Sequence, residues 1–417
     1  MLLLIINTLR TSKYMRNNKT KEYSRDKLDG NSSELVKNKM INKKVVHLLM
    51  TDYKIDSRVR NETNSLVGFG YEVLVCCLSG GEQPKIERRE QVNIHRFGFG
   101  RSRLLQYMTA YLFMFIYLLR QKLDIIHAHD LTALPIAVLI SKLKRIPLVY
   151  DSHELWSQSH HGNHPSWAIK GMKIFERLFG GQSDAVISVS GGIATYLKKY
   201  LDVPIVSTIR NIPSYTQKGD YDLFRSEFSI DKMAPIFLYQ GLISQSRGVD
   251  VFFQAALKVC AKNSVAFIFM GSGPYAEILR HQIAESGIEN IFYKDAVSQN
   301  ELLKYTNSAD VGVHAIKNSC LNHDLCLPNK LFEYMSAGIP VLVSELTEME
   351  SFVKQYGIGV CFENDSVDDL AEKIQYLLDN TDVLADFKEH SVKASKSITW
   401  KAESVILKEL YSDLLAR

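Results

Sequence analysis

One carboxylate, Glu333, stands inside the otherwise mostly apolar stretch LPNKLFEYMSAG, residues 327–338. Proline is favoured at the first position of a helix, because the N–H that it lacks would be unpaired there anyway. We therefore expect a helix that begins at Pro328 and ends at Gly338, with Pro340 just beyond it. The free amides of its first turn would bind an anion, and Glu333 would then reach a sugar hydroxyl of the same ligand. The alternative is a solvent-facing glutamate on an amphipathic helix.

A cation precedes a second expected helix in YQGLISQSRGVDVFF, residues 239–253. We expect a strand to end at Gly241 and a loop that contains Arg247 to follow it. At the carboxyl end of a strand, an arginine can hold a diphosphate through charge-assisted hydrogen bonds, each worth about 1.5–3 kcal/mol. The alternative is a solvated loop arginine.

The sequence GSGPYA, residues 271–276, follows an expected strand and matches the pattern G-x-G-x-x-A. On a dinucleotide-binding interpretation, Asp295 would hold a ribose. The turn, however, follows the second strand of its domain and not the first. We therefore favour a tight turn in which Gly271 and Gly273 let a ligand or a helix approach closely.

Two polar motifs, HAHD (127–130) and DSHEL (151–155), end strands in the first half of the chain. The carboxyl ends of parallel strands lie at one edge of a sheet. That edge would collect His127, His129, Asp130, Asp151, His153 and Glu154. Alternation along the strand puts His127 and His129 on the same side. Because no spacing matches a known metal motif, we expect these groups to bond hydroxyls of a ligand, with a structural histidine as the alternative for His127. The single D-x-D, DYD at 220–222, lies in a polar linker, and we expect no metal there.

Apolar runs alternate with helical patterns from Val45 onward, which predicts parallel sheets covered by helices on both faces. The expected strands cover 45–50, 71–78, 92–97, 124–129, 147–153, 185–190, 204–211, 234–241, 265–273, 290–297, 310–316, 339–345 and 358–364. A polar, turn-rich stretch at 211–222 interrupts the alternation. We therefore predict two doubly wound, Rossmann-like α/β domains that face one another across a cleft, where ligands bind. The expected boundaries are 1–44 for a tail, 45–212 and 213–395 for the domains, and 396–417 for a last helix.

Composition excludes several classes of protein. Residues 1–44 hold eleven Lys or Arg against four Asp or Glu, a net charge of +7, whereas the rest of the chain carries −3. The folded body is thus not strongly basic, so we expect no nucleic acid partner. The six cysteines form no C-x-x-C pair, which fits a reducing cytosol. We expect the basic tail, residues 1–44, to be poorly ordered.

The most apolar stretch, LLQYMTAYLFMFIYLL at 104–119, is too short for a membrane span. We expect it to be a helix buried against the sheet. The alternative is a helix that lies in a membrane interface, to which the +7 tail would add attraction for anionic lipid.

Taken together, these segments resemble the retaining GT-B glycosyltransferases of family 4 over residues 45–400. The segments that carry the resemblance are DSRVRNETNSLVGFGYEVLV, DIIHAHDLTALP, VYDSHEL, TIRNIP, YQGLISQSRGVD, GSGP and LPNKLFEYMSAGIPVLVS. The form LPNK resembles a subgroup that makes bacterial surface polysaccharides such as capsule.

The resemblance implies roles for residues of the second domain. Glu333 would hold the ribose of a nucleotide-sugar donor, and Arg247 would hold its diphosphate with amides near Cys326 and Leu327. The backbone at Ala296 and Val297 would meet the base. The other implied donor-binding residues are Gly241, Gly271, Gly273, Asn329 and Lys330.

In the first domain, His153 would face the transferred sugar, and His129, Asp130 and Glu154 would lie on the acceptor side. The resemblance implies no metal ion and no cofactor, with the leaving phosphate itself accepting the proton of the acceptor.

Two positions depart from the family pattern. Leu325 stands where a second glutamate is common, with Asp324 as a possible substitute, and Leu242 stands where arginine is common. Lys330 would supply some of the charge missing at position 242.

The expected function is therefore transfer of a sugar to a glycan or lipid-linked acceptor, in the cytoplasm and with possible peripheral contact to the inner face of the membrane. The alternatives are a sugar-nucleotide epimerase and an inactive partner subunit that only binds the nucleotide sugar.

Overall fold

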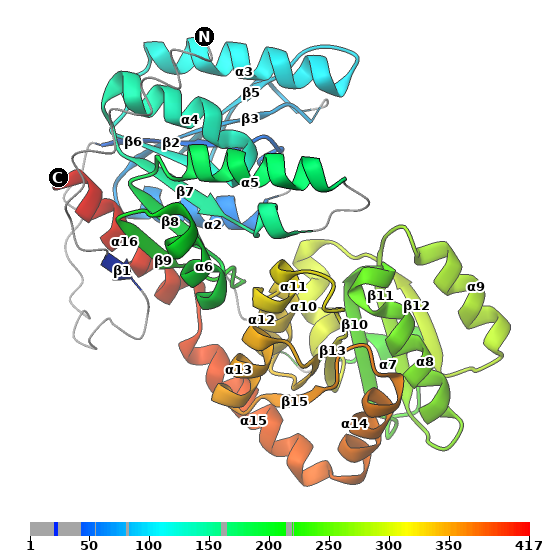
Figure 1. Ribbon diagram of the computed structural model, residues 1–417. Coiled ribbons are helices and arrows are strands. Elements are labelled where there is room, and N and C mark those ends of the chain that lie inside the picture. The colour runs from blue at the N-terminus through cyan, green and yellow to red at the C-terminus, as the bar shows by residue number, and fades with distance from the viewer. Residues whose placement is uncertain are drawn as a thin grey trace. The chain divides into compact units, whose positions relative to one another are not determined.

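The computed structural model describes the backbone of residues 21–23. It describes residues 43–54, 56–80, 83–159, 165–213, 219 and 221–417 in full. The chain divides into two compact units, shown in Figure 1. The N-terminal unit comprises Met1–Arg210 and Lys401–Arg417, and the C-terminal unit comprises Asn211–Trp400. Each unit is an α/β domain built on its own sheet, as the alternation of strand and helix patterns predicted.

The N-terminal unit contains nine strands in the order β1-β9-β8-β7-β6-β2-β3-β5-β4. They are β1 (Lys21–Tyr23), β2 (Lys44–Leu48), β3 (Glu72–Leu78), β4 (Ile86–Arg89), β5 (Val92–Phe97), β6 (Ile125–His129), β7 (Leu148–Ser152), β8 (Ala185–Ser188) and β9 (Ile205–Thr208). All neighbours pair in parallel except β4, which pairs with β5 in the antiparallel direction. The strand order reverses between β2 and β6, so this is the point where a ligand site is expected.

The helices of the N-terminal unit lie between these strands, and the last helix of the chain joins them. They are α2 (Ser57–Gly68), α3 (Arg103–Arg120), α4 (Asp130–Lys144), η3 (Trp156–Gln158), α5 (Ser166–Gly180), α6 (Gly191–Leu201) and α16 (Trp400–Leu415). Capping side chains fix several starts: Asp56 accepts from the Val59 amide at 3.1 Å, and Ser102 accepts from the Leu105 amide.

The C-terminal unit has six parallel strands in the order β12-β11-β10-β13-β14-β15. They are β10 (Ile236–Leu242), β11 (Ala266–Ser272), β12 (Ile291–Asp295), β13 (Val311–His314), β14 (Val341–Ser344) and β15 (Gly359–Phe362). This is the doubly wound order 3-2-1-4-5-6, which reverses between β10 and β13. Figure 1 shows helices on both faces of this sheet, and a buried apolar cluster lies under each layer.

The helices of the C-terminal unit connect its strands and cover its sheet. They are α7 (Leu223–Phe228), η4 (Gln245–Arg247), α8 (Val249–Cys260), α9 (Ala276–Ser286), α10 (Gln299–Asn307), α11 (Leu321–Leu325), α12 (Asn329–Ala337), α13 (Thr347–Tyr356), α14 (Val367–Asp379) and α15 (Thr381–Ser397). Helix α12 ends at Gly338 with φ of 76°, as expected, but Pro328 is its N-cap and Asn329 its first residue. The expected start at Pro328 is therefore wrong by one residue.

All thirteen expected strands occur, with ends shifted by a few residues, and two further strands were not expected. Strand β4 (IERR) lies at the edge of its sheet and is mostly exposed, so it lacks an apolar pattern. Strand β1 pairs with β9 inside the segment expected to be a poorly ordered tail, and that expectation is wrong for these three residues. The other residues before Lys43 lie outside the described residues.

Helix α3 is not buried against the sheet along its length, so that expectation is also wrong. It buries only Ala110, Met114 and Leu118. Large apolar side chains that remain exposed are Leu104, Leu105, Met108, Leu112, Phe113, Ile116 and Leu119. Helix α3 is thus apolar on its covered face and also on its uncovered face. Among the described residues, no helix is both long and apolar enough to cross a membrane.

Candidate active site

The expected ribose ligand, Glu333, lies on α12 next to the end of strand β10. Its Oε2 accepts a hydrogen bond of 2.6 Å from the side-chain amide of Gln240. The carbonyl oxygen of that amide accepts in turn from the Thr306 hydroxyl at 2.8 Å. The pKa of Glu333 is raised, because the effect of burial outweighs the lowering effects of the Gln240 amide and of Lys330. Glu333 is thus held in position on the strand-end side of α12 and does not simply face solvent.

Lys330 lies one turn before Glu333 on α12, and its side chain passes over the end of strand β10. Its Nζ is 3.3 Å from the Tyr239 hydroxyl and 4.6 Å from the centre of that ring. A Cβ atom on Gly241, whose φ is 110°, would stand 2.4 Å from Lys330 Cε. Gly241 therefore provides the room through which the ammonium group reaches the strand end.

The charge of Arg247 acts on this ammonium group, and both cations act on a third basic residue, His314. Burial lowers the pKa of Lys330 to about 7, and the positive charge of Arg247 acts in the same direction. Arg247 is the last residue of η4, and within the described residues it has no ion-pair partner. His314, at the end of β13, is fully buried, and neither of its ring nitrogens has a hydrogen-bond partner among the described residues. Its pKa is lowered by burial and by the charges of Lys330 and Arg247. Lys330 and Arg247 thus bring two basic side chains to this site against one carboxylate, that of Glu333, and this balance favours an anion.

The expected glycine turn allows two loops to approach each other. A Cβ atom on Gly271 would lie 1.8 Å from the Gly241 carbonyl oxygen, and one on Gly273 would lie 2.3 Å from that of Ile243. Gly271 and Gly273 therefore let the β11 turn lie against the β10 end. Asp295, the ribose ligand of the dinucleotide interpretation, is paired with Arg280 on the exposed surface.

The segment before α12 places the remaining expected donor residues. Leu327 is buried, Cys326 and Val297 are half-buried, and Asn329 is exposed at the first position of α12. Asp324 was the possible substitute for the missing glutamate at position 325, and its carboxylate accepts from the Thr347 amide at 3.1 Å, at the start of α13. In the linker, Asp222 pairs with Arg225 at 3.3 Å, and Asp220 lies outside the described residues.

The histidines of the N-terminal unit gather where its strand order reverses. His47 on β2 lies in register with His127 on β6, and His129 on β6 lies in register with Asp151 on β7. The rings of His127 and His129 stack with centroids 4.5 Å apart, so both side chains lie on the same side, as alternation predicted. His127 and His129 are 0% and 2% exposed. The structural alternative thus holds for His127, and His129 is too buried to touch an acceptor as expected.

A chain of hydrogen bonds links these rings to the last helix. His129 Nε2 is 2.8 Å from His47 Nδ1, and His127 Nδ1 is 2.6 Å from the Tyr411 hydroxyl of α16. The Tyr411 hydroxyl is also 3.5 Å from His47 Nε2. Burial lowers the pKa values of all three histidines, to about 3 for His129. The three imidazoles are therefore neutral at physiological pH.

A buried ion pair between Arg58 and Asp151 lies next to this cluster. Arg58 donates from Nε and Nη2 to the two oxygens of Asp151 at 2.8 Å each, and from Nη1 to the Ile209 carbonyl at 2.7 Å. Glu62 is fully buried with its Oε1 3.3 Å from Arg58 Nε, and in the described part of the chain neither of its carboxylate oxygens has a hydrogen-bond partner. Burial, followed by the Asp151 charge, raises the pKa of Glu62 well above its usual value.

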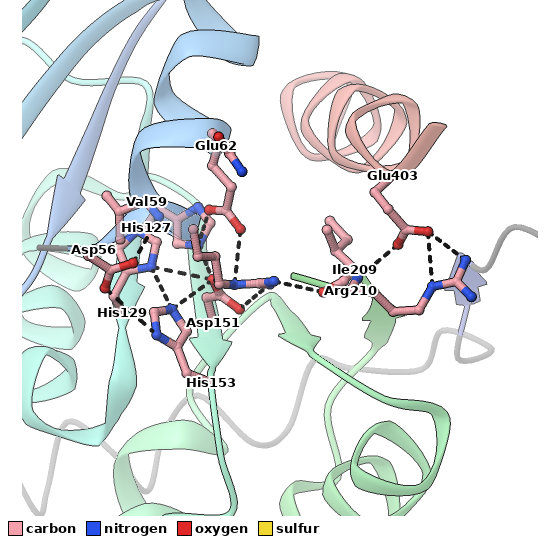
Figure 2. A network of polar contacts seen from close by, with 12 residues as sticks. Asp56, Val59, Glu62, His127, His129, Asp151, His153, Ile209, Arg210 and Glu403 are labelled. Carbon is pink, nitrogen blue, oxygen red and sulfur yellow. Dashed lines mark hydrogen bonds and ion pairs between the residues drawn. The ribbon is translucent and has the colours of Figure 1, made fainter. Parts of the chain in front are cut away.

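His153 follows β7 and is the least buried ring of the histidine cluster, and Figure 2 shows it beside Asp151. Its Nε2 is 3.2 Å from Asp151 Oδ2, and its Nδ1 is 3.5 Å from Asp130 Oδ2. Burial opposes a charge on this ring, but Asp130 and Asp151 outweigh that effect and raise its pKa to about 10. His153 is 19% exposed and therefore accessible. Asp130 also accepts from the Trp156 indole at 3.0 Å, and Glu154 is partly exposed beside it.

Sequence reasoning did not single out His47, Arg58, Glu62, Gln240, His314 or Tyr411. Three of these, His47, Gln240 and His314, share a signal: each is a polar residue inside an apolar strand run, close to its carboxyl end. Tyr411 carries no such signal, because the residue that it bonds, His127, lies 284 positions away along the chain.

Comparison with known proteins identifies a family for each half of the chain. Residues 56–212 match the family described as Glycosyltransferase Family 4, and residues 220–394 match Glycosyl transferases group 1. The chain is 21% identical over 386 residues to a D-inositol 3-phosphate glycosyltransferase of Corynebacterium aurimucosum, covering 86% of this chain and 90% of that protein.

Solved structures are similar over most of the chain. Sucrose-phosphate synthase from Thermosynechococcus elongatus aligns with a TM-score of 0.74 and 16% identity, over 90% of this chain and 100% of that one. HepE from Anabaena in complex with UDP aligns with a TM-score of 0.70 and 16% identity, over 89% of this chain and 100% of that one. WaaG, a glycosyltransferase involved in lipopolysaccharide biosynthesis, aligns with a TM-score of 0.65 and 14% identity, over 87% of this chain and 99% of that one.

Two parallel-sheet α/β domains of these topologies, with site residues at their strand ends, define a GT-B glycosyltransferase. The chain belongs to glycosyltransferase family 4 and is an enzyme that uses nucleotide sugars.

Proposed function

We propose that this enzyme transfers a sugar from a nucleoside diphosphate to a glycan or lipid-linked acceptor with retention of configuration, in the synthesis of a cell-surface polysaccharide. The observation that carries the donor half of this proposal is the group of side chains at the β10 and β13 ends. There the anchored Glu333 lies beside an excess of positive charge from Lys330 and Arg247.

The donor would bind with its ribose on Glu333 and its diphosphate on Arg247 and Lys330, near the amides of Cys326 and Leu327. Breaking the sugar–phosphate bond adds negative charge to the leaving diphosphate, and fixed cations stabilise that charge more in the transition state than in the ground state. The base would lie against the backbone at Val297. This arrangement needs no metal ion at the diphosphate.

His153 is the residue proposed to face the transferred sugar. Its pKa of about 10 makes it a hydrogen-bond donor at neutral pH, so it would orient a sugar hydroxyl and not act as a base. The leaving phosphate would accept the proton of the acceptor on the same face, which retains the configuration. Asp130 and Glu154 remain the proposed acceptor-side groups, and His129 would orient His153 through their 3.2 Å contact.

The known relatives support this donor class. HepE is known in complex with UDP and with UDP-glucose, and the curated relative is a glycosyltransferase for D-inositol 3-phosphate. WaaG acts in lipopolysaccharide biosynthesis, which supports a surface glycan as the product.

A lipid-linked acceptor agrees with the surface chemistry of three neighbouring helices. Helices α3, α4 and α5 lie side by side on one side of the sheet (Figure 1). Besides the exposed apolar side chains of α3, this layer exposes Leu143, Trp167, Ile174, Phe175 and Leu178. In α3 and α5 the charged residues are Arg103, Arg120, Lys170, Lys173, Arg177 and a fully buried Glu176.

An exposed apolar surface rimmed by basic groups suits an anionic membrane. We therefore propose that the enzyme works in the cytoplasm, at the inner face of the cell membrane, with this layer against the lipid.

One assay tests the proposal against its alternatives. Purified protein is incubated with UDP-, GDP- and ADP-sugars, with and without a lipid-linked glycan acceptor. Nucleotide release that depends on the acceptor, with retained configuration in the product, is the expected result. A new sugar nucleotide formed without acceptor would instead identify an epimerase. Binding without turnover across the panel would identify an inactive partner subunit, the candidate that Leu325 in place of a glutamate motivates.

A further inference from the structure

The side chain of Gln240, near the end of β10, uses both ends of its amide. Gln240 is only 1% exposed. Its Nε2 donates to Glu333 Oε2 of α12 at 2.6 Å, and its Oε1 accepts from the hydroxyl of Thr306, in α10, at 2.8 Å. Helices α10 and α12 pack against each other in the C-terminal unit (Figure 1). One buried amide thus connects a hydroxyl of one helix to the carboxylate of the other.

The backbone of the same residue also holds α12 in place. The N–H of Gln240 donates to the Tyr334 hydroxyl at 3.1 Å. Gly312 of β13 leaves room for the tyrosine ring, because a Cβ atom there would lie 2.2 Å from Tyr334 Cγ. Tyr334 is the neighbour of Glu333 on the helix, so these contacts keep the Glu333 side chain within reach of the Gln240 amide. What the amide itself decides is the rotation and the charge of the carboxylate.

The Gln240 amide can be oriented in two ways, and each suits a different state of Glu333. The Thr306 hydroxyl has one hydrogen but two acceptors at 2.8 Å, Gln240 Oε1 and the Leu302 carbonyl. When the hydroxyl donates to Gln240, the amide N–H faces Glu333, which suits an ionised carboxylate. When it donates to Leu302, its oxygen can accept from the amide. The amide carbonyl then faces Glu333, and a protonated carboxyl must donate to it.

A ribose would select the first of these two arrangements. Its hydroxyls donate more strongly to an ionised carboxylate than to a neutral carboxyl group. The bond from Gln240 to Oε2 also fixes the rotation of the Glu333 carboxylate, and therefore the place of Oε1. A carboxylate that is already oriented loses little conformational freedom when the ligand binds.

We propose that Gln240, oriented by Thr306, is a positioning residue that fixes the Glu333 carboxylate and so makes the enzyme select ribonucleotide donors over deoxyribonucleotide donors. The inference rests on the proposed function, in which Glu333 holds the ribose. Gln240 acts through Glu333 and does not need to touch the donor.

The charges around Glu333 determine how the site can be tested. Gln240 and Lys330 both lower the pKa of Glu333, against the larger effect of burial. The other titratable groups that interact with Glu333 or Lys330 are Arg247 of η4, His314 at the end of β13, Cys326 before α12, and the hydroxyls of Tyr239 and Tyr334. Lys330 has a pKa of about 7, so its own titration must be separated from that of Glu333.

The ratio of two dissociation constants isolates the ribose contact. Full-length protein is titrated calorimetrically with the tightest-binding of UDP, GDP and ADP, and with the 2′-deoxy and 3′-deoxy forms of that nucleotide. The Kd of a deoxy form is divided by the Kd of the ribonucleotide. Base and diphosphate are the same in both, so the effects of Lys330 and of the terminal phosphate cancel. For at least one of the two hydroxyls, we expect a ratio of about 10–100 in the parent, the usual effect of a hydrogen bond to a charged group.

Three variants test the role of the amide. Gln240→Met keeps the length of the side chain but removes both hydrogen bonds, and it should lower the ratio at least about fivefold. Thr306→Val removes only the hydroxyl that orients the amide, and it should also lower the ratio, although the printed bonds of Thr306 go to Gln240 and Leu302 and not to Glu333. Thr306→Ser keeps the hydroxyl and should behave as the parent does. The two Thr306 variants thus separate the hydrogen bond from packing.

The pH dependence of the ratio distinguishes positioning from a general loss of structure. In the parent, the ratio should fall in acid as Glu333 takes up a proton. The Gln240 amide stabilises the ionised form, so Gln240→Met raises the pKa of Glu333 further, and the fall should begin at a higher pH. Tyr305→Phe is the matched control, because it removes a hydroxyl of the same helix that bonds Glu227. It should change neither the ratio nor its pH dependence.

Glu333→Gln separates a failure of this inference from a failure of the proposed function. The inference alone is overturned if Glu333→Gln lowers the ratio while Gln240→Met and Thr306→Val keep the parental ratio and pH dependence. It is also overturned if Thr306→Ser lowers the ratio as much as Thr306→Val does. A parental ratio near one, or a ratio that Glu333→Gln leaves unchanged, would remove Glu333 from the ribose and overturn both. Circular dichroism checks that each variant is folded, and the two Thr306 variants decide the question if Gln240→Met is not.

Discussion

The Gln240 amide donates to Glu333 Oε2 at 2.6 Å and thereby ties the end of β10 to the middle of α12. Within the described residues, the other oxygen of Glu333 has no hydrogen-bond partner. One oxygen is thus anchored and the other remains for a ligand. A group that is already positioned loses little conformational freedom when a ligand binds.

The first prediction concerns this carboxylate. Glu333→Ala and Glu333→Gln should each weaken donor-nucleotide binding by about 10–100-fold, because a hydrogen bond to a charged group contributes about 1.5–3 kcal/mol. Isothermal titration calorimetry with the tightest-binding nucleotide of the UDP, GDP and ADP panel measures the effect. Glu372→Gln, an exposed glutamate of α14, is the matched control. Unchanged affinity in both Glu333 variants would remove Glu333 from the donor site.

The second prediction concerns pH and Lys330. The pKa of Lys330 is lowered to about 7, so its ammonium group is charged below pH 7 and loses its proton above it. A bound diphosphate favours the charged form and raises this pKa, so binding must take up a proton at alkaline pH. Donor affinity should therefore fall as pH rises from 6 to 9, by up to about tenfold per unit above pH 7.

A nucleotide sugar is the correct probe for this measurement, because its diphosphate lacks the terminal phosphate that titrates near neutrality. Lys330→Arg should bind with little pH dependence, since arginine stays charged over this range. Lys330→Met should bind weakly at all pH values. A slope that persists in Lys330→Met would show that another group causes it.

The sequence predicted the fold better than it predicted the sites, for reasons visible in particular residues. Strands such as 71–78 and 265–273 are continuous apolar runs, and burial on both faces leaves a clear pattern. Glu333 and Arg247 were singled out because helix-start and loop signals lie beside them. The contact of Asp324 with Thr347 could not be predicted, because Thr347 lies in a different helix.

The ion pair of Arg58 and Asp151 was missed for the same reason. The two residues are 93 positions apart, and nothing local distinguishes Arg58 from the surface residues of an amphipathic helix. Contacts between distant segments depend on how strands are ordered in the sheet, which local sequence patterns do not specify.

The third prediction concerns the stability of this ion pair. Arg58→Ala leaves the Asp151 carboxylate buried without its bidentate partner, which should lower the free energy of unfolding by about 3–5 kcal/mol. Urea unfolding followed by tryptophan fluorescence is suitable, because Trp156 and Trp167 both lie in the N-terminal unit.

Two comparisons make the Arg58 measurement specific. Lys43→Ala breaks an exposed pair with Asp124 in the same unit and should cost less than about 1 kcal/mol. Adding Asp151→Asn to Arg58→Ala should recover part of the loss, because it removes the uncompensated charge. A cost for Arg58→Ala no larger than that of Lys43→Ala would contradict the buried-pair interpretation.

The last prediction concerns the exposed apolar layer of α3. Leu112→Glu and Phe113→Glu together replace two exposed apolar side chains with acids and should lower partition onto anionic vesicles by at least about tenfold. Each apolar side chain contributes about 1.5–3 kcal/mol when fully removed from water, and an anionic surface repels the new charges. Sedimentation with phosphatidylglycerol vesicles, compared with phosphatidylcholine vesicles, measures the partition. Because both positions are exposed, thermal stability should not change.

Two controls separate this surface from other sources of membrane attraction. Ile278→Glu places an acid on an exposed apolar position of α9 in the C-terminal unit and should leave partition unchanged. Deletion of residues 1–42 removes most of the basic tail and should reduce binding only at low salt, since electrostatic attraction is screened and apolar contact is not. If the deletion abolishes partition at all salt concentrations while Leu112→Glu with Phe113→Glu has no effect, the tail and not α3 is the membrane contact.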